Sequence, residues 1–131
     1  MDKNDIILDS VNKYLKETFR FKRNVATFGL DNRTIIVRIK PINLYLRLMD
    51  EDGFWFASTI VIARLGFQQE RIGHGADFLR FISKIAVEHR YRYIGLESTN
   101  AKSTAFGLKY GFRMHKGENN HYIISINELY L

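Results

Sequence analysis

The chain has 131 residues, of which 46% are hydrophobic and 14% aromatic, and its formal net charge is +6. This apolar content excludes a disordered chain, and the length fits one domain, so we predict a single domain over residues 1–131. The complete lack of Cys excludes disulfides, thiolate nucleophiles and Cys-ligated zinc.

The sequence contains no apolar run near the ~20 residues that span a bilayer, and its polar start lacks the apolar stretch of a signal peptide. We therefore expect a soluble, cytoplasmic protein with no membrane partner. The positive charge favours an anionic partner, which is a nucleic acid, a phosphate-bearing cofactor or an acidic protein.

The first predicted element is a helix. Ile7, Val11 and Leu15 recur at helical spacing, and Asn4 or Asp5 can provide the N-cap. This spacing predicts a helix over residues 5–19, followed by a basic stretch at 20–23.

From residue 24 to 67 the pattern is that of strands. We expect strands over 25–28, 34–39, 43–49 and 54–65, with Leu44, Leu46 and Leu48 on one face of the third. Pro41 interrupts the pattern because it cannot donate to a ladder, and residues 50–53 are typical of a hairpin turn. This region predicts an antiparallel meander.

The remaining elements alternate between helix and strand. A helix is expected over 73–89, a short buried strand over 93–96, a short helix over 103–109 and a final strand pair over 112–115 and 121–126. A short buried strand between two helices indicates a parallel crossover from the preceding long strand. The fold class is therefore α/β.

A possible phosphate-binding loop follows the long strand. The segment from Ile62 to Ala76 runs from a strand through a polar loop into the helix start Gly73-His74-Gly75-Ala76. Free amides at a helix N-terminus bind anions, and glycine lets the backbone approach a phosphate closely. A tight turn into a closely packed helix explains the same glycines. Phe78 excludes a complete G-x-G-x-x-G motif, and no Walker motif is present.

A second segment contains Asn100, Ser103 and the run Lys109-Tyr110-Gly111-Phe112. In their order and spacing, the two segments resemble the GNAT family of acyl-CoA N-acyltransferases. Residues 64–76 resemble the family's pyrophosphate loop, and residues 100–112 its "Asn…Tyr…Gly-Phe" segment. The resemblance implies a mixed, mostly antiparallel sheet with a central pair of splayed parallel strands, flanked by helices. It covers the chain from Thr34 onward and implies a shortened N-terminal half.

The resemblance also implies that acetyl-CoA is the co-substrate and that no metal takes part. The pantetheine arm would lie between the splayed strands, the pyrophosphate on the loop amides, and the following helix on the other side of the cofactor. The cofactor-binding residues implied in this way are Leu65, Phe67, Arg71, Ile72, Gly73, His74, Gly75, Ala76, Asn100 and Ser103.

The acid and base positions of the family carry no titratable side chain here. Gly107 matches the usual Tyr, and Gly95 and Thr59 match the two usual positions of a carboxylate base. Glu97 and Tyr110 are the candidate catalytic substitutes. Each also has a purely structural interpretation, Glu97 as a solvated or hydrogen-bonded loop carboxylate and Tyr110 as a core side chain.

Two functions follow from these features. The first is an N-acetyltransferase that moves an acetyl group from acetyl-CoA to an amine acceptor by direct attack; acidic residues at 50–52 and Glu97 would favour a cationic amine. The second is a catalytically silent protein of the same fold whose basic surface, near residues 20–23 and 89–92, binds nucleic acid or an acidic protein. The four His show no metal-ligand spacing.

Overall fold

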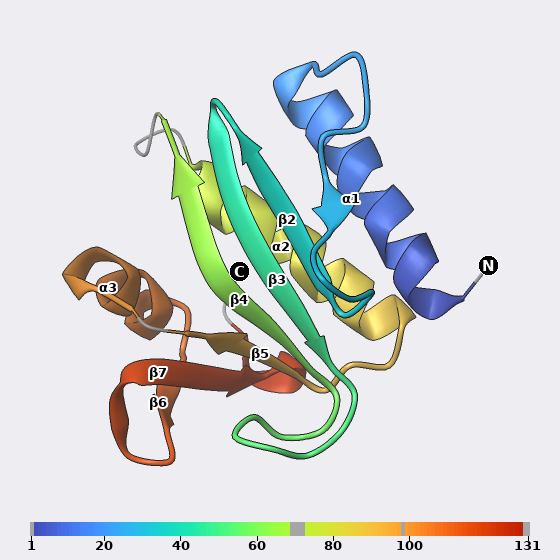
Figure 1. The fold of residues 1–131 in the computed structure, drawn as a ribbon. Helices are drawn as coiled ribbons and strands as arrows, with labels where there is room; N and C mark the ends of the chain where they lie inside the picture. The colour runs from blue at the N-terminus through green and yellow to red at the C-terminus, as the bar shows by residue number, and fades with distance from the viewer. Residues whose placement is uncertain (1, 69–72, 98, 130–131) are drawn as a thin grey trace.

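The computed structural model describes residues 2–68, 73–97 and 99–129. Its centre is a seven-stranded sheet with the strand order β1-β2-β3-β4-β5-β7-β6, flanked by helices (Figure 1). The elements in chain order are α1 Lys3–Phe19, β1 Thr27–Phe28, β2 Thr34–Ile39, β3 Ile42–Met49, β4 Thr59–Phe67, α2 His74–Glu88, β5 Tyr93–Leu96, α3 Ala101–Lys109, β6 Arg113–His115, β7 Glu118–Ser125 and the 3-10 helix η2 Ile126–Glu128.

The pairing of the strands confirms the predicted fold class. Strands β1 to β4 are antiparallel neighbours, β4 and β5 are parallel, and β5–β7 and β6–β7 are antiparallel. The connection from β4 through α2 to β5 is the expected crossover. None of the described helices is long and apolar enough to cross a membrane.

Two local expectations were wrong. The strand expected from residue 54 begins only at Thr59, because residues 50–58 fold as a loop in which Trp55 turns inward and is 3% exposed. The N-cap of α1 is Asp2, whose carboxylate accepts from the Asp5 amide at 2.9 Å. Asn4 lies inside the helix, and its Nδ2 donates to the Asn32 carbonyl at 2.9 Å.

The two faces of the sheet differ in how they are covered. Along β3 the expected alternation is confirmed, since Ile42, Leu44, Leu46 and Leu48 are buried. These side chains belong to one core cluster with Ile7, Val11 and Leu15 of α1 and Phe78, Leu79 and Ile82 of α2. Burial of each such side chain contributes about 1.5–3 kcal/mol. We call this the helix face.

We call the opposite side of the sheet the loop face. The register places Arg47 of β3, Val61 of β4 and Gly95 of β5 side by side in adjacent strands. The loop of residues 50–58 folds over this face at the lower end of the molecule in Figure 1. Arg47 and Gly95 therefore share their environment with the loop and not with α1 or α2.

Strand β4 is bent at a β-bulge. Tyr45 pairs with Arg64 and Leu46 pairs with Ile62, so Ala63 is one extra residue on β4. A bulge bends its strand and increases the local twist. Parallel pairing with β5 covers only residues 59–62 of β4, and the last main-chain bond between them runs from the Glu97 amide to the Ile62 carbonyl. From Ala63 onward β4 continues beside β3 alone among the described residues.

Candidate functional site

A cleft of about 560 Å³ lies where β4 and β5 part. Its walls come from the second half of β4, the segment after β5, and the starts of α2 and α3. The lining residues are Ile62, Ala63, Arg64, Leu65, Gly66, Phe67, Gly75, Leu96, Glu97, Thr99, Asn100, Lys102, Ser103 and Phe106. Five of the predicted cofactor-binding residues are thus brought together: Leu65, Phe67, Gly75, Asn100 and Ser103.

One wall of the cleft is an open strand edge. Leu65 and Phe67 lie on the part of β4 whose β5 side has no partner strand within the described residues. An unpaired strand edge presents main-chain donors and acceptors to whatever lies against it. This edge suits a ligand that itself carries amide groups.

The second wall is the start of α2. Gly73 is its N-cap with φ 78°, a left-handed conformation that favours glycine, and it provides no side-chain cap. The amides of the first turn therefore keep the partial positive charge of a helix N-terminus. A Cβ added at Gly75 would lie 3.1 Å from the Phe106 ring, which shows how closely α2 and α3 approach here.

The third wall is the start of α3, which is closed by a capping box. The Asn100 Oδ1 accepts from the Ser103 amide at 3.0 Å, and the Ser103 Oγ accepts from the Asn100 amide at 2.9 Å. The capping box uses the Asn100 carbonyl oxygen and not its Nδ2. Both residues therefore have a structural role in addition to their place in the cleft.

The other predicted cofactor-binding residues are placed differently. Arg71 and Ile72 lie outside the described residues. His74 packs its ring against Phe19 and Phe67, with ring centres 4.8 and 5.1 Å apart. Ala76 is half-buried in the first turn of α2. Gly73, His74 and Ala76 are not among the residues that line the cleft, and their role in cofactor binding stays a prediction.

Glu97 lies where the cleft meets the loop face. Its side chain is 17% exposed, and its Oε2 lies 3.3 Å from the Arg47 Nη2. The Trp55 Nε1 donates to its Oε1 at 3.4 Å. The carboxylate is therefore held in place from β3 and from the loop of residues 50–58, and it also lines the cleft.

Tyr110 occupies a different place. It is the C-cap of α3, with its ring 5.0 Å from Phe106, and it packs against the core. It is not among the residues that line the cleft. The structure does not bring it together with Glu97, and its catalytic role stays a prediction.

The three acid and base positions of the family are occupied by packing. A Cβ on Gly95 would come within 2.6 Å of the Trp55 ring, and one on Gly107 within 2.8 Å of the Leu96 Cδ1. Thr59 is fully buried, and its hydroxyl donates to the Phe56 carbonyl at 2.7 Å. The indole therefore favours glycine at position 95, whereas the Leu96 Cδ1 beside Gly107 is the end of a flexible side chain and can shift. Glu97, which directly follows β5, is the carboxylate two residues from Gly95.

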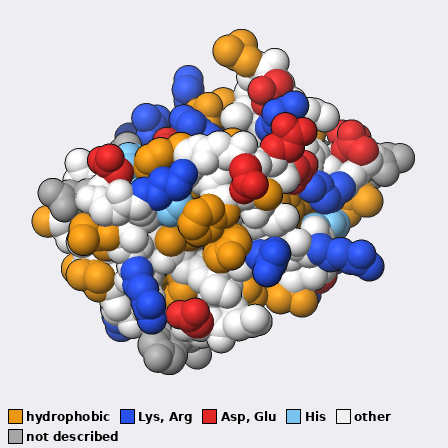
Figure 2. All heavy atoms as spheres, turned by 90° about the horizontal axis from the view of Figure 1, so that it is seen from below, with side chains coloured by type: hydrophobic (Ala, Val, Ile, Leu, Met, Phe, Trp, Pro, Cys, Tyr) orange, Lys and Arg blue, Asp and Glu red, His pale blue; other side chains and the backbone are white. Residues whose placement is uncertain are grey.

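An aromatic cluster around Trp55 was missed by the sequence analysis. The Trp55 ring stacks on His115 with centres 4.7 Å apart, and the His115 Nε2 donates to the Phe54 carbonyl at 2.6 Å. Figure 2, a view onto the lower end of Figure 1, shows hydrophobic side chains near its centre with charged side chains around them. Residue types at 54–56 fitted a strand, and the glycine at 95 in a buried strand was the only sign of a large neighbour.

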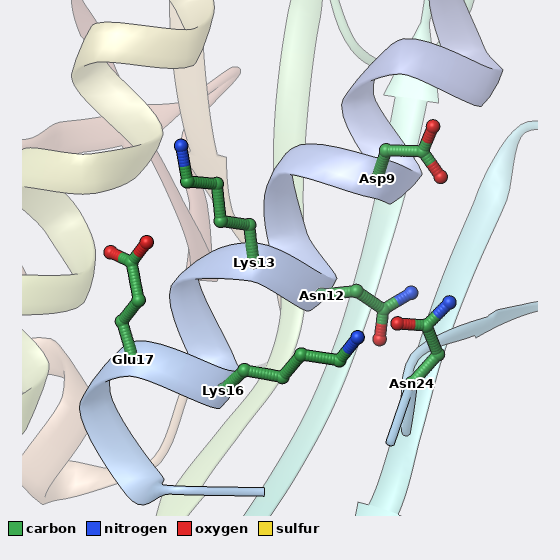
Figure 3. Close-up of a pocket in the computed structure, with 6 residues that line it drawn as sticks. All are labelled: Asp9, Asn12, Lys13, Lys16, Glu17 and Asn24. Atoms are coloured by element: carbon green, nitrogen blue, oxygen red, sulfur yellow. The ribbon is translucent and has the colours of Figure 1, made fainter. Parts of the chain in front are cut away.

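A second hollow, of about 360 Å³, lies along α1. Figure 3 shows Lys16 extending toward Asn12 and Asn24, whereas Lys13 and Glu17 point to the other side of the helix. Asn12 is buried and binds the Val25 and Ala26 backbone, which fixes the chain after α1. The side chains that line this hollow point in different directions, and none of them is a predicted site residue.

No metal centre is formed by the described part of the chain, because it contains no group of three or more His, Asp or Glu side chains placed to hold an ion. The charged residues in the described lining of the cleft are Arg64, Lys102 and Glu97, which give it a net positive charge. This balance suits an anionic ligand.

Comparisons with known proteins agree with this geometry. No family model matches the sequence, and no curated protein matches it. Among solved structures, a GNAT-family acetyltransferase from Staphylococcus aureus Mu50 superposes with a TM-score of 0.55 at 12% identity, covering 94% of this chain and 92% of its own. Tetrahymena GCN5 gives a TM-score of 0.56 at 10% identity, covering 100% and 92%.

A third structure was solved with the cofactor. The PaiA N-acetyltransferase from Thermoplasma acidophilum in complex with coenzyme A gives a TM-score of 0.50 at 15% identity, covering 74% of this chain and 60% of its own. These likenesses show the GNAT fold that the two sequence segments implied.

Proposed function

We propose that this chain, which has the GNAT fold, is an N-acetyltransferase that moves an acetyl group from acetyl-CoA to an amine. The observation that carries the proposal is the cleft between β4 and β5, which has an open strand edge on one side, an uncapped helix start on the other and the Glu97 carboxylate in its lining. Ligands of open α/β sheets bind at such a parting of strands.

The residues of the cleft fit the parts of acetyl-CoA. The open edge of β4 at Leu65 and Phe67 would bind the amides of the pantetheine arm. The first amides of α2, with Gly75 admitting close approach, would bind the pyrophosphate. Asn100 and Ser103 would contact the cofactor from α3. Arg64 and Lys102 in the lining add positive charge beside the phosphates.

The chemistry required of the chain is small. Acetyl-CoA supplies an activated thioester whose thiolate leaves readily. The acceptor nitrogen attacks the thioester carbonyl, forming the C–N bond as the C–S bond breaks, and Glu97 takes the proton that the nitrogen loses. The thiolate takes its proton from water. Positioning of the amine accounts for the remaining rate enhancement, so no acid is needed at Gly107.

The test begins with binding and continues with turnover. Acetyl-CoA at 100 times its dissociation constant should raise the free energy of unfolding by about 2.7 kcal/mol, which thermal shift and calorimetry measure. Thiol release with a panel of amines then detects transfer. No stabilisation at millimolar acetyl-CoA would reject the acyl-CoA function.

Glu97 can be tested separately. Glu97→Gln keeps one acceptor oxygen, so it can hold one of the two donors, Arg47 or Trp55, but it cannot take a proton. We therefore expect kcat to fall by about 100-fold or more. Acetyl-CoA affinity should stay unchanged in calorimetry. An unchanged kcat would remove Glu97 from the mechanism while leaving the cofactor site intact.

The alternative is a protein of this fold that binds without catalysing. It is favoured by one specific observation, that Trp55 and Leu96 fill the space at Gly95 and Gly107 where catalytic side chains would stand. Such a protein would show acetyl-CoA binding, or binding of nucleic acid to its basic segments, with no thiol release from any amine.

A further inference from the structure

We propose that the amine acceptor is an amino acid or a similar small molecule with a carboxylate beside its amine, and that Arg47 binds that carboxylate. This inference rests on the proposed function, because it assigns the acceptor of the same site. It is carried by the charges that the chain places on the loop face next to the cleft.

Arg47 lies in the row of the sheet that contains Gly95, and next to Glu97, which lines the cleft. Arg47 pairs with Val61 of β4, and Val61 pairs with Gly95 of β5, two residues before Glu97. The bulge at Ala63, where β4 leaves β5, follows two residues after Val61. Arg47 and Glu97 thus approach the mouth of the cleft from the two strands that flank β4.

The guanidinium of Arg47 is only partly used by the chain. One nitrogen, Nη2, lies 3.3 Å from the Glu97 carboxylate, and the side chain is 41% exposed. Its Nε is buried and has no hydrogen-bond partner within the described residues. A guanidinium presents a fork of donors that matches a carboxylate with two parallel hydrogen bonds. The contact with Glu97 is a single one and Nε is buried, so the terminal nitrogens provide the donors that are left for a ligand.

The ion pair of Arg47 and Glu97 lies near the surface but is partly shielded from water by aromatic rings. The Arg47 guanidinium lies 5.4 Å from the Tyr45 ring centre, and Trp55 donates to Glu97 from the other side. Aromatic walls strengthen electrostatic interactions by excluding water. A ligand that enters here meets one positive and one negative group, side by side.

The charge balance of this pair selects the acceptor. A plain cationic amine must take Glu97 away from Arg47, and then a half-buried arginine is left without its partner, which is costly. A bound amino acid would replace the Arg47–Glu97 ion pair with two ion pairs, one between its ammonium group and Glu97 and one between its carboxylate and Arg47. The site therefore favours a ligand with both charges.

The acidic residues of the loop do not compensate for a plain cation. Asp50 accepts from the Lys3 Nζ at 2.6 Å and from the Tyr91 hydroxyl at 2.9 Å. Asp52 accepts from the Ala57 amide at 2.7 Å within the loop itself. Asp50 and Asp52 are thus engaged by the fold, and the attraction of a cationic amine to residues 50–52 stays a prediction.

The experiment compares each amino acid with its own amide. Thiol release with acetyl-CoA is measured for a series of amino acids and for the matching amino acid amides, which keep the amine and lose the carboxylate. We expect kcat/KM to be at least about tenfold higher for the acids, the ratio that 1.4 kcal/mol of one charged contact gives. Arg47→Gln should remove this ratio by raising KM for the acids and not for the amides, whereas any change in kcat through Glu97 should be the same for both series.

The controls separate the residue from the fold. Arg113→Gln removes an exposed arginine of β6 that pairs with Glu128 at 3.6 Å, and it should keep the full ratio. Arg47→Lys keeps the charge but loses the fork, so it should keep part of the ratio and serves if Arg47→Gln folds poorly.

Three outcomes would overturn the inference. Equal or better rates with the amides would reject the carboxylate, and an unchanged ratio in Arg47→Gln and Arg47→Lys would reject Arg47. Thiol release from neither series, in a protein that binds acetyl-CoA by calorimetry, would reject this acceptor class. A protein that fails to bind acetyl-CoA at all would instead reject the proposed function.

Discussion

The cleft and the loop face meet at Glu97 but are built in different ways. The cleft is made mainly of backbone, namely the open edge of β4, the uncapped start of α2 and the capped start of α3. The loop face is made of side chains from distant parts of the chain, since Trp55 comes from a loop, Arg47 from β3 and Glu97 from the segment after β5. A backbone site keeps a recognisable pattern of glycines and caps, whereas a side-chain site can change with every residue that packs on it.

This difference has a functional meaning. A cofactor that is the same for every enzyme of the fold can be bound by amides that every sequence provides. The acceptor differs from one enzyme to another, so the side chains of its site must determine which acceptor binds. In this chain Trp55 fills the space beside Gly95 that a larger side chain would need.

The largest effect should come from the side chain that organises the loop face. Trp55→Ala removes a 3% exposed indole that packs on Gly95 and stacks on His115. We expect the free energy of unfolding to fall by about 3–5 kcal/mol in urea titration. Acetyl-CoA affinity, measured on the folded protein, should change little because Trp55 does not line the cleft.

The matched control for this variant is its neighbour in the same loop. Phe54→Ala removes a ring that is 44% exposed, so its cost should be clearly smaller. A loss of stability as small for Trp55→Ala as for Phe54→Ala would show that the loop is not anchored by its indole. A large loss of acetyl-CoA affinity would show that the two regions are not separable.

The sequence predicted the cleft, which is built from backbone, better than the loop face, which is built from side chains. The order of the elements, the parallel β4–β5 pair and the cleft residues Leu65, Gly75 and Asn100 were predicted, because periodicity, glycine and capping residues report on backbone geometry. The loop at 50–58 was predicted as part of a strand, since Phe54, Trp55 and Phe56 suit a strand and only tertiary packing turns Trp55 onto Gly95. The Arg47–Glu97 pair could not be predicted, because it depends on the register of three strands.

The next effect concerns the backbone site. Gly75→Glu places a carboxylate beside the helix start and a Cβ 3.1 Å from the Phe106 ring. Acetyl-CoA affinity should fall by at least about 100-fold, equivalent to about 2.7 kcal/mol, because the new charge repels the phosphates. Gly53→Glu is the matched control, since a Cβ there meets nothing within 4 Å. Equal affinities in the two variants would mean that the cofactor does not use the start of α2.

A smaller effect on stability is expected at alkaline pH, from one tyrosine beside the loop and one between the helices. Burial raises the pKa of the Tyr91 hydroxyl above its ordinary value of 10.0, and the Asp50 carboxylate that accepts its hydrogen bond raises it further. The same causes raise the pKa of Tyr14, which donates to Asp77 of α2 at 2.6 Å. Tyr91 anchors the first residue of the loop, whereas Tyr14 ties α1 to α2.

The sign follows from the proton balance. The unfolded chain loses the tyrosine proton near pH 10 and the folded chain only above it, so the stability from each hydrogen bond is complete below pH 10 and is lost as the pH rises further. Above pH 10, each tyrosine should lower the free energy of unfolding by at most about 1.4 kcal/mol per pH unit. Urea titrations at pH 8 and 11 should show a smaller alkaline loss for Tyr91→Phe and for Tyr14→Phe than for the wild type. A loss of equal size in all three proteins would contradict the assignment.

The smallest effect tests whether the cap of α3 belongs to the fold or to the cofactor. Asn100→Ala removes the oxygen that accepts from the Ser103 amide, and loss of an N-cap costs about 1 kcal/mol of stability. Asn100→Asp keeps that acceptor and restores the cap, but it replaces the Nδ2 group with a negative charge. If Asn100 only caps the helix, Asn100→Asp should recover both stability and acetyl-CoA affinity. If its amide also meets the cofactor, Asn100→Asp should recover stability in urea while its affinity in calorimetry stays below that of the wild type, and this second result is the one we expect because Asn100 lines the cleft.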